Sequence, residues 1–206
     1  MDNVRSATPG QVRRSPSVPA HWPIRRHVAA AETTPAGPLH SVEVTVPAKT
    51  NLTLHVGPAH EEWGGRHALD TIYCAIGVND VVTATAKTPG SGFSLELSGE
   101  HLGDLASSGS DMRRNHAVLA LFAIARAAGR EPDVALHVDK HIPVGAGLGG
   151  GSADAAATLL AVNTLWGLHW PIERLRDIAA TLGSDMPFCL EGGYAHGTGF
   201  GERIIP

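Results

Sequence analysis

The chain has 206 residues, of which 43% are hydrophobic and 17% are charged, so it is long enough to bury one sizeable core. Its longest uninterrupted apolar run, Ala117–Ala125, has nine residues, whereas a membrane-spanning helix needs about 20, so we expect no membrane partner. The net charge is +3 over residues 1–41 and −7 over the remainder, and a mildly acidic body argues against nucleic acid as a partner.

Residues 1–40 differ from the rest of the chain, with frequent proline steps, scattered arginines and no hydrophobic period. Such a segment buries too little apolar surface to offset its ordering entropy, which predicts a disordered tail. An acid-poor start with Arg and Ser is also typical of an organellar transit peptide, and that alternative stays open. Because no secretory signal is evident and Cys74 and Cys189 are the only cysteines, we expect two reduced core thiols and a cytoplasmic location.

From residue 41 onward, hydrophobic periodicity predicts both strands and helices. The alternating or apolar-rich runs that predict strands cover residues 42–46, 52–56 after an interruption at 47–51, 71–86, 93–97, 134–138, 194–196 and 203–205. The helical patterns cover residues 115–128, with Gly129 as the cap, 152–166 and 172–182. Strands and helices without regular βαβ alternation favour an α+β fold, which we assign to residues 41–206.

The most informative segment is glycine-rich and lies between a predicted strand and a predicted helix. Residues 143–154 read Pro-Val-Gly-Ala-Gly-Leu-Gly-Gly-Gly-Ser-Ala-Asp. Glycines carry an entropic cost that makes sense where the backbone must approach a ligand, and a helix N-terminus attracts anions. We expect Ser152 at the N-cap, where its hydroxyl reaches a phosphate or Mg²⁺, and Asp154 in the first turn, within reach of a metal. The segment lacks the Lys of a Walker loop.

This segment resembles the phosphate loop of the GHMP small-molecule kinases, and three further stretches resemble family motifs in the expected order. They are Pro-Ala-Lys-Thr-Asn-Leu at 47–52, Gly-Arg-His-Ala-Leu-Asp-Thr at 65–71 and Leu-Gly-Ser-Asp-Met-Pro-Phe at 182–188. The match covers residues 42–206. The Gly-Leu-Gly-Gly-Gly-Ser form is similar to the branch that phosphorylates the 2-hydroxyl of 4-diphosphocytidyl-2-C-methyl-D-erythritol in the non-mevalonate isoprenoid (terpenoid) pathway.

The resemblance implies the GHMP kinase N-terminal fold, similar to ribosomal protein S5 domain 2, and an ATP-dependent phosphotransferase that uses Mg²⁺. It places Lys49 and Asp185 at the catalytic positions, and their chemistry is sensible in its own right. An alcohol is a poor nucleophile, so a nearby carboxylate that accepts its proton assists phosphoryl transfer. An ammonium beside that carboxylate keeps it ionised and neutralises charge on the transferred group.

The resemblance also implies the residues that bind the two substrates. For ATP they are Asn115, Lys140, Pro143, Val144, Gly145, Ala146, Gly147, Leu148, Gly149, Gly150, Gly151, Ser152 and Ala153, with Ser152 reaching the Mg²⁺ held by ATP. For the small-molecule substrate they are Asn51, Arg66 and His67. Asn115 is equally well explained as a helix N-cap. Arg66 stands where the family has Tyr, and a guanidinium can also stack on a base.

The family continues into a second half that supplies part of the substrate cleft. A one-sided cleft excludes water badly, so we expect the chain alone to show little or no kinase activity unless a partner chain completes it. Two other interpretations stay open. The chain is another GHMP kinase, such as a homoserine or mevalonate-type enzyme, or it is a non-catalytic nucleotide-binding remnant or subunit.

Overall fold

The computed structural model describes residues 24–27, 39–100, 102 and 112–206. Its strands are β1 (Ile24–His27), β2 (Ser41–His60), β3 (Arg66–Ala86), β4 (Ser94–Gly99), β5 (Val134–Lys140), β6 (Tyr194–Thr198) and β7 (Arg203–Ile205). Its helices are α1 (His116–Ala128), α2 (Gly150–Leu165), α3 (Ile172–Leu182) and α4 (Met186–Glu191), with 3-10 turns η1 (Glu61–Trp63) and η3 (Met112–Arg114).

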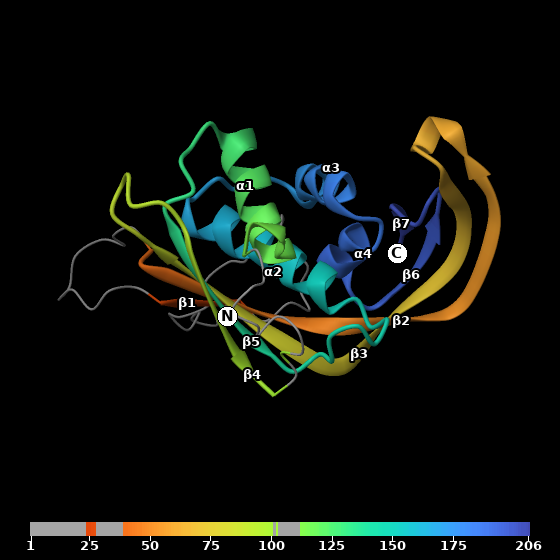
Figure 1. The fold of residues 1–206 in the computed structure, drawn as a ribbon, viewed down its shortest axis with the longest axis horizontal. Coiled ribbons are helices and arrows are strands. Elements are labelled where there is room, and N and C mark those ends of the chain that lie inside the picture. The colour runs from red at the N-terminus through yellow and green to blue at the C-terminus, as the bar shows by residue number, and fades with distance from the viewer. Residues whose placement is uncertain (1–23, 28–38, 101, 103–111) are drawn as a thin grey trace, which may run out of the picture.

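The described elements form two layers, a mixed sheet and a set of helices that cover one of its faces (Figure 1). The sheet order is β1-β2-β3-β5-β4, and β6 pairs with the first half of β3 and with β7. The pairs are antiparallel except β4 and β5, which are parallel. This architecture confirms the α+β class.

The core lies between the sheet and α2. Val42, Val44 and Val46 alternate along β2 and are fully buried, and burying each such side chain is worth about 1.5–3 kcal/mol. Helix α2 packs against β2 and β3 on one side and against α1 and α4 on others, so all but one of residues 153–165 are buried. Its many alanines allow it to lie close to the sheet. The last residues of the glycine-rich segment, 150–154, form the first turn of this central helix.

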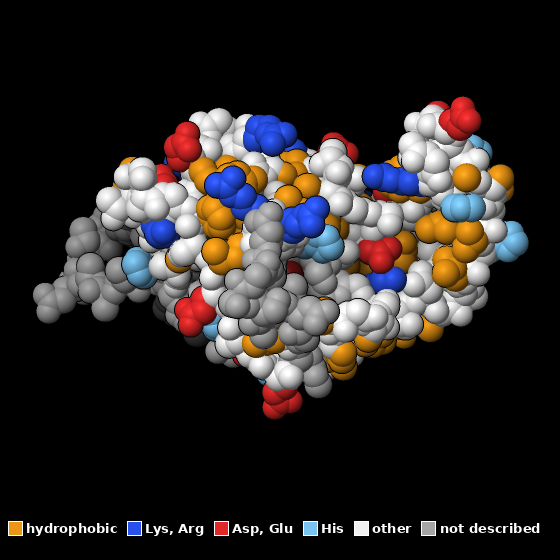
Figure 2. Space-filling view, viewed as in Figure 1, with side chains coloured by type: hydrophobic (Ala, Val, Ile, Leu, Met, Phe, Trp, Pro, Cys, Tyr) orange, Lys and Arg blue, Asp and Glu red, His pale blue; other side chains and the backbone are white. Residues whose placement is uncertain are grey.

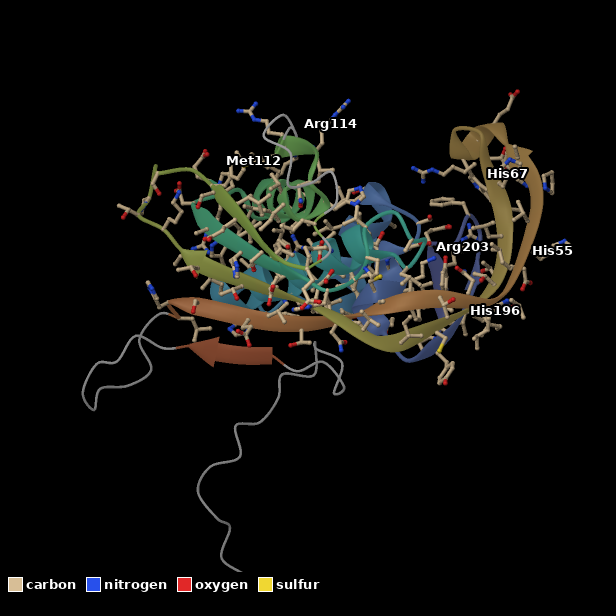
Figure 3. The ribbon with its side chains drawn as sticks, turned by 60° about the horizontal axis from the view of Figure 1, so that its bottom comes forward. His55, His67, Met112, Arg114, His196 and Arg203 are labelled. Carbon is tan, nitrogen blue, oxygen red and sulfur yellow. The ribbon has the colours of Figure 1, made fainter. Side chains whose placement is uncertain are left out.

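The β2–β3 hairpin extends beyond the helices and curls upward at its closed end (Figure 1). Leu52, Leu54 and Val56 are exposed on it, and His55 and His67 both lie on this raised end (Figure 3). The surface is hollowed between the helical layer and the raised end, where acidic and basic side chains are both exposed (Figure 2). The hairpin therefore forms one wall of an open cleft.

The predicted interruption of the first strand is wrong, because β2 runs unbroken through residues 47–51. Register shifts occur between Pro47 and Ala48 and again between Asn51 and Thr53. Such bulges let a strand accommodate a proline and turn its side chains. The sequence patterns do not predict α4, in which Pro187 stands in the first turn, a position that suits proline.

One strand lies inside the segment expected to be a disordered tail. Residues Ile24–His27 form β1 and pair antiparallel with residues 41–44. Residues 1–23 and 28–38 lie outside the described residues, and so does the transit-peptide alternative for them. Cys74 and Cys189 are free and buried, as predicted. Among the described residues, no helix combines the length and apolarity that crossing a membrane requires.

Helix α1 has the boundaries that the sequence predicts. The Asn115 side chain caps it by accepting a hydrogen bond of 2.9 Å from the Ala117 N–H, and Gly129 ends it in the left-handed conformation. We expect Asn115→Ala to lower the free energy of unfolding by about 1 kcal/mol, because the cap is lost. Urea unfolding followed by circular dichroism measures the difference. Asn115→Ser keeps a capping oxygen and is the control; equal losses for Ala and Ser would contradict the capping role.

Candidate active site

Lys49 on β2 and Asp185, just before α4, meet in the cleft. The Lys49 Nζ lies 3.0 Å from Asp185 Oδ2, and the two side chains are 9% and 28% exposed. The same ammonium donates a hydrogen bond of 2.9 Å to Asn51 Oδ1. The structure thus brings together the two residues predicted to be catalytic and one predicted to bind substrate. The partial exposure of Asp185 leaves its carboxylate accessible from the cleft.

The position of Asp185 follows from the packing of α4. Met186, Pro187 and Phe188 are buried, which fixes the start of this short helix. Asp185 occupies the N-cap position, yet its side chain makes no capping hydrogen bond. Its Oδ1 instead accepts a hydrogen bond of 3.1 Å from the Tyr73 hydroxyl. Both carboxylate oxygens are therefore held by side chains from the sheet.

Asn51 is held by a chain of hydrogen bonds across the hairpin. Its amide donates to Thr71 Oγ1 at 2.7 Å, and the Thr71 hydroxyl donates to the Thr53 carbonyl at 2.6 Å. The bulge after Asn51 creates this arrangement. With its amide fixed, the Asn51 carbonyl oxygen faces Lys49. The ammonium is therefore oriented by two acceptors, one from each wall of the cleft.

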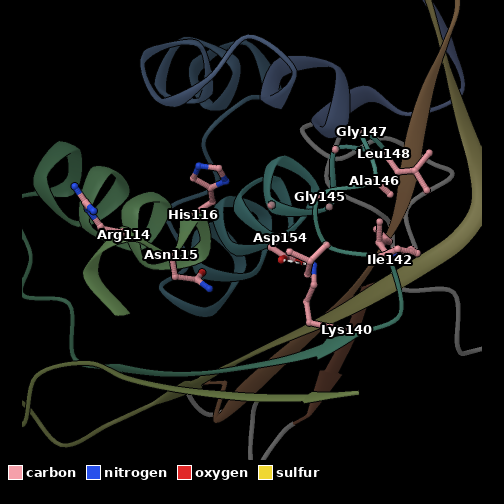
Figure 4. Close-up of a pocket in the computed structure, with 15 residues that line it drawn as sticks. Arg114, Asn115, His116, Lys140, Ile142, Gly145, Ala146, Gly147, Leu148 and Asp154 are labelled. Carbon is pink, nitrogen blue, oxygen red and sulfur yellow. Dashed lines mark hydrogen bonds and ion pairs between the residues drawn. The ribbon is translucent and has the colours of Figure 1, made fainter. Parts of the chain in front are cut away.

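A pocket of about 290 Å³ is lined by the glycine-rich loop (Figure 4). Its lining residues are Arg114, Asn115, His116, Lys140, Ile142, Pro143, Val144, Gly145, Ala146, Gly147, Leu148, Gly149, Gly150, Gly151 and Asp154. The loop is tied to β2, because the Lys49 N–H donates to the Leu148 carbonyl at 2.9 Å. One residue thus links the pocket to the Lys49–Asp185 pair.

The loop conformation requires glycine at alternate positions. Gly145, Gly147 and Gly149 have φ of 77°, 75° and 71°, in the left-handed region that other residues rarely adopt. Helix α2 begins at Gly150 with Gly149 as its N-cap, so the expectation of Ser152 at the N-cap is wrong. Ser152 lies within the first turn, and neither it nor Ala153 lines the pocket. The unpaired N–H groups of that first turn suit an anion.

Lys140 lies beneath the loop in a buried ionic cluster. Its Nζ contacts Asp80 and lies 2.7 Å from Asp154 Oδ2, and Lys140 is 1% exposed. Asp80 Oδ1 also accepts the N–H groups of His141 at 2.6 Å and Ile142 at 2.8 Å. The ammonium expected to contact a nucleotide is therefore engaged by two carboxylates. The cluster fixes the segment that leads into the loop.

Burial and the neighbouring charges act against each other on the pKa values of this cluster. It raises the pKa of Asp154 to about 7, against the opposing effect of Lys140. Burial disfavours the Lys140 ammonium, but Asp154 and Asp80 outweigh it and raise the pKa of Lys140. At the pocket wall, burial and then Lys140 lower the pKa of His116. Asp154 Oδ1 is buried and has no hydrogen-bond partner among the described residues.

Arg66 and His67 lie on the raised end of the hairpin and do not line the pocket. The Arg66 guanidinium lies 4.4 Å from the centroid of the Phe200 ring, and His67 Nδ1 lies 2.8 Å from the Gly57 carbonyl oxygen. The turn at residues 199–201 connects the raised end of the hairpin to Asp185. Phe200 contacts Arg66, and the Gly201 carbonyl contacts the hydroxyl of Tyr73, which binds Asp185. Arg66 and His67 thus lie on the raised end of the hairpin, apart from the glycine-rich loop.

Sequence reasoning missed Tyr73 and Asp80. Tyr73 occupies an ordinary buried strand position, and no local pattern marks its contact with Asp185. Asp80 is fully buried in β3, but a single Asp in a strand is unremarkable until β5 and α2 are packed around it. Neither residue stands in a recognisable motif, so no signal in a single sequence distinguishes them.

Comparison with known proteins identifies the class that this fold and site define. The family described as "GHMP kinases N terminal domain" matches residues 115–193. A solved structure of 4-(cytidine 5'-diphospho)-2C-methyl-D-erythritol kinase superposes with a TM-score of 0.62 at 36% identity, covering 80% of this chain and 54% of its own. The chain belongs to the GHMP kinase superfamily and carries its N-terminal domain fold.

Within that superfamily, one curated relative has the name 4-diphosphocytidyl-2-C-methyl-D-erythritol kinase, from Bifidobacterium adolescentis. It is 77% identical over 166 residues, which are 81% of this chain and 54% of the relative. The homoserine kinase of Cytophaga hutchinsonii superposes with a TM-score of 0.61 at 18% identity, covering 84% of this chain and 54% of its own, and shares the fold alone. The chain spans about half the length of the curated relatives it matches.

Proposed function

We propose that residues 41–206 are the nucleotide-binding domain of a kinase that transfers phosphate from ATP to the 2-hydroxyl of 4-diphosphocytidyl-2-C-methyl-D-erythritol. The observation that carries the proposal is the Lys49–Asp185 pair beside the glycine-rich loop, joined to it by the Lys49 N–H bond to Leu148. The name of the relatives supports the choice of acceptor.

The geometry suits in-line phosphoryl transfer to an alcohol. Asp185 accepts the proton of the acceptor hydroxyl as its oxygen bonds to the γ-phosphorus. The bond from that phosphorus to the β,γ-bridging oxygen breaks, and ADP leaves with the electron pair. Lys49 lies 3.0 Å from the Asp185 carboxylate, where its charge stabilises the negative charge on the transferred group. The N–H groups at the start of α2 hold the phosphates.

The residues beside the loop fit a magnesium ion that arrives with ATP. Among the described residues, no group of three or more His, Cys, Asp or Glu side chains is placed to hold a metal. Mg²⁺ is commonly bound by substrate phosphates with one or two protein oxygens. Asp154 lines the pocket, and its unpartnered Oδ1 would be the protein oxygen that binds the ion. Ser152 lies in the first turn of α2 outside the pocket lining, so its hydroxyl would take part only if its side chain turns toward the phosphates. When bound, the ion neutralises phosphate charge.

The remaining assignments follow from the same proposal. Asn115 and the loop bind ATP, with Lys140 supporting them from below, while Asn51, Arg66 and His67 contact the acceptor. Because the relatives are about twice as long as the matched region, we infer that full activity requires a counterpart of their second half, joined to this domain or supplied by a partner chain. The two buried free thiols suit a reducing compartment such as the cytoplasm.

A coupled ADP-release assay tests the proposal, with purified protein, ATP, Mg²⁺ and 4-diphosphocytidyl-2-C-methyl-D-erythritol. We expect Asp185→Asn to lower kcat by about 10²- to 10⁴-fold, because the proton acceptor is lost, and to leave the Kd for ATP unchanged. Asp177→Asn, on the exposed face of α3, is the matched control. If wild type turns over, an equal rate for Asp185→Asn would refute the role of the pair. ATP binding without turnover by folded wild-type protein would show that this chain alone does not perform the reaction.

A further inference from the structure

The Tyr73 hydroxyl lies between a carboxylate and a carbonyl in the interior of the protein. Tyr73 is 1% exposed, and its ring stacks on Phe188 of α4 with centroids 4.8 Å apart and planes at 19°. The hydroxyl donates to Asp185 Oδ1 at 3.1 Å and also lies 3.4 Å from the Gly201 carbonyl oxygen. A phenol has one proton to donate. The Tyr73 phenol therefore has one proton and two acceptors within reach, Asp185 Oδ1 and the Gly201 carbonyl.

We propose that Tyr73 is a positioning residue that orients Asp185 and keeps it fully hydrogen-bonded both before and after it takes up the acceptor proton. This inference rests on the proposed function. In this proposal the two oxygens of the Asp185 carboxylate have different partners. Lys49 pairs with Oδ2, and Tyr73 donates a hydrogen bond to Oδ1. Because both partners are anchored in the sheet, they fix the rotation of the carboxylate as well as its place.

The two acceptors of Tyr73 match the two states of Asp185. While the carboxylate is charged, the phenol donates to Oδ1. Once Asp185 holds the substrate proton, Tyr73 turns its own proton to the Gly201 carbonyl, and the phenol oxygen accepts from the protonated Oδ1. No proton leaves Tyr73 in this exchange. A buried polar group without a partner costs about 1–3 kcal/mol, and the exchange avoids that cost in both states.

The surroundings of Tyr73 favour Oδ1 as the atom that carries the proton. An ammonium has only donors, so a proton on Oδ2 would face the Lys49 donor without an acceptor. A proton on Oδ1 meets the phenol oxygen. Burial and then the Asp185 charge raise the pKa of Tyr73 well above its usual range, so the phenol stays protonated and remains a donor.

Gly201 provides a second and independent observation. Its φ is +104°, and a Cβ there would lie 2.7 Å from the Tyr73 hydroxyl oxygen. Only glycine allows the turn at residues 199–201 to approach the phenol this closely. The carbonyl that Tyr73 uses as its second acceptor is thus delivered by a backbone conformation that other residues would strain.

The first test needs no turnover and uses the fact that the chain has two tyrosines. Protein labelled with 3-fluorotyrosine gives two ¹⁹F signals, which Tyr194→Phe assigns, because Tyr194 is 69% exposed. We expect Asp185→Asn and Gly201→Ala each to shift the Tyr73 signal and to leave the Tyr194 signal in place. The control Asp177→Asn should move neither. If the Tyr73 signal keeps its wild-type chemical shift in both variants, the proposal is overturned.

The second test uses Tyr73→Phe, which keeps the stacked ring and removes only the hydroxyl. We expect kcat in the ADP-release assay to fall by about 10- to 100-fold with both KM values unchanged, because small misplacement of a reacting group is costly. An unchanged kcat, with Asp185→Asn still impaired, overturns the proposal and leaves the proposed function standing. If wild type shows no turnover, the crystal structure of Tyr73→Phe decides. Asp185 should rotate away from Lys49, and an unmoved carboxylate overturns the proposal.

Discussion

Replacing Lys140 by Met is expected to lower the free energy of unfolding by about 3–5 kcal/mol, which is the usual cost of removing one partner of a buried ion pair. Lys140 is the only cation in contact with the carboxylates of Asp80 and Asp154 among the described residues. Methionine fills the space of the lysine stem but leaves both carboxylates buried without a counter-charge. Chemical unfolding monitored by circular dichroism measures the loss.

Lys87→Met is the matched control for this experiment. Among the described residues, the Lys87 ammonium reaches only the Ser91 carbonyl, at 3.5 Å, so we expect a change within about 0.5 kcal/mol. If Lys140→Met does not fold, the triple variant that also carries Asp80→Asn and Asp154→Asn should recover folded protein, because it removes the uncompensated charge as well. A Lys140→Met protein as stable as Lys87→Met would show that the cluster contributes nothing to the fold.

Two alanine substitutions in the glycine-rich loop should differ sharply although they lie two residues apart. Gly147 and Gly149 have nearly the same positive φ, so each substitution carries a left-handed strain of about 1–2 kcal/mol. At Gly147 an added Cβ meets no atom within 4 Å, whereas at Gly149 it would lie 2.8 Å from Lys49 Cγ. We expect Gly149→Ala to lose a further amount of about 1–3 kcal/mol, because it overpacks the Lys49 side chain.

The same pair of variants separates strain in the loop from displacement of Lys49 in the Lys49–Asp185 pair. Urea unfolding gives the two free energies, and the ADP-release assay gives kcat for each variant. Gly149→Ala should reduce kcat well beyond Gly147→Ala, because the displaced Lys49 no longer meets Asp185. Equal stability and equal kcat for the two would mean that Lys49 moves aside freely, and would contradict the tight contact between the loop and β2.

The parts of the fold that the sequence predicts are those with a local pattern. Alternating valines at residues 42–46 predict the buried face of β2, and Asn115 with Gly129 predicts both ends of α1. The interruption predicted around Pro47 is wrong, and α4, with Pro187 in its first turn, is not predicted. A proline at a bulge leaves a strand continuous, and a proline in a first turn begins a helix, so the same residue type marks no break at either position.

The candidate site also has one part that sequence motifs predict and another that no local pattern reveals. The ordered motifs single out Lys49, Asp185 and the loop, and the structure brings them together. Single-sequence reasoning could not foresee the ionic cluster, because Asp80, Lys140 and Asp154 come from β3, β5 and α2 and meet only in the folded protein. The same holds for Tyr73 and Asp185. Their contact depends on how α4 packs against β3, which no hydrophobic period records.

The placement of the Lys49–Asp185 pair has a consequence for the order of folding. The glycine-rich loop connects β5 directly to α2, so much of it assembles from contacts between neighbours in the chain. Lys49 and Asp185 come from opposite ends of the described chain, and contacts between distant segments must first overcome the entropy of closing a long loop. We therefore expect the Lys49–Asp185 contact to form late in folding, after the segments that carry the two residues have packed together. On this expectation, the two functions proposed for the site, anion binding and proton acceptance, come together only in the completed domain.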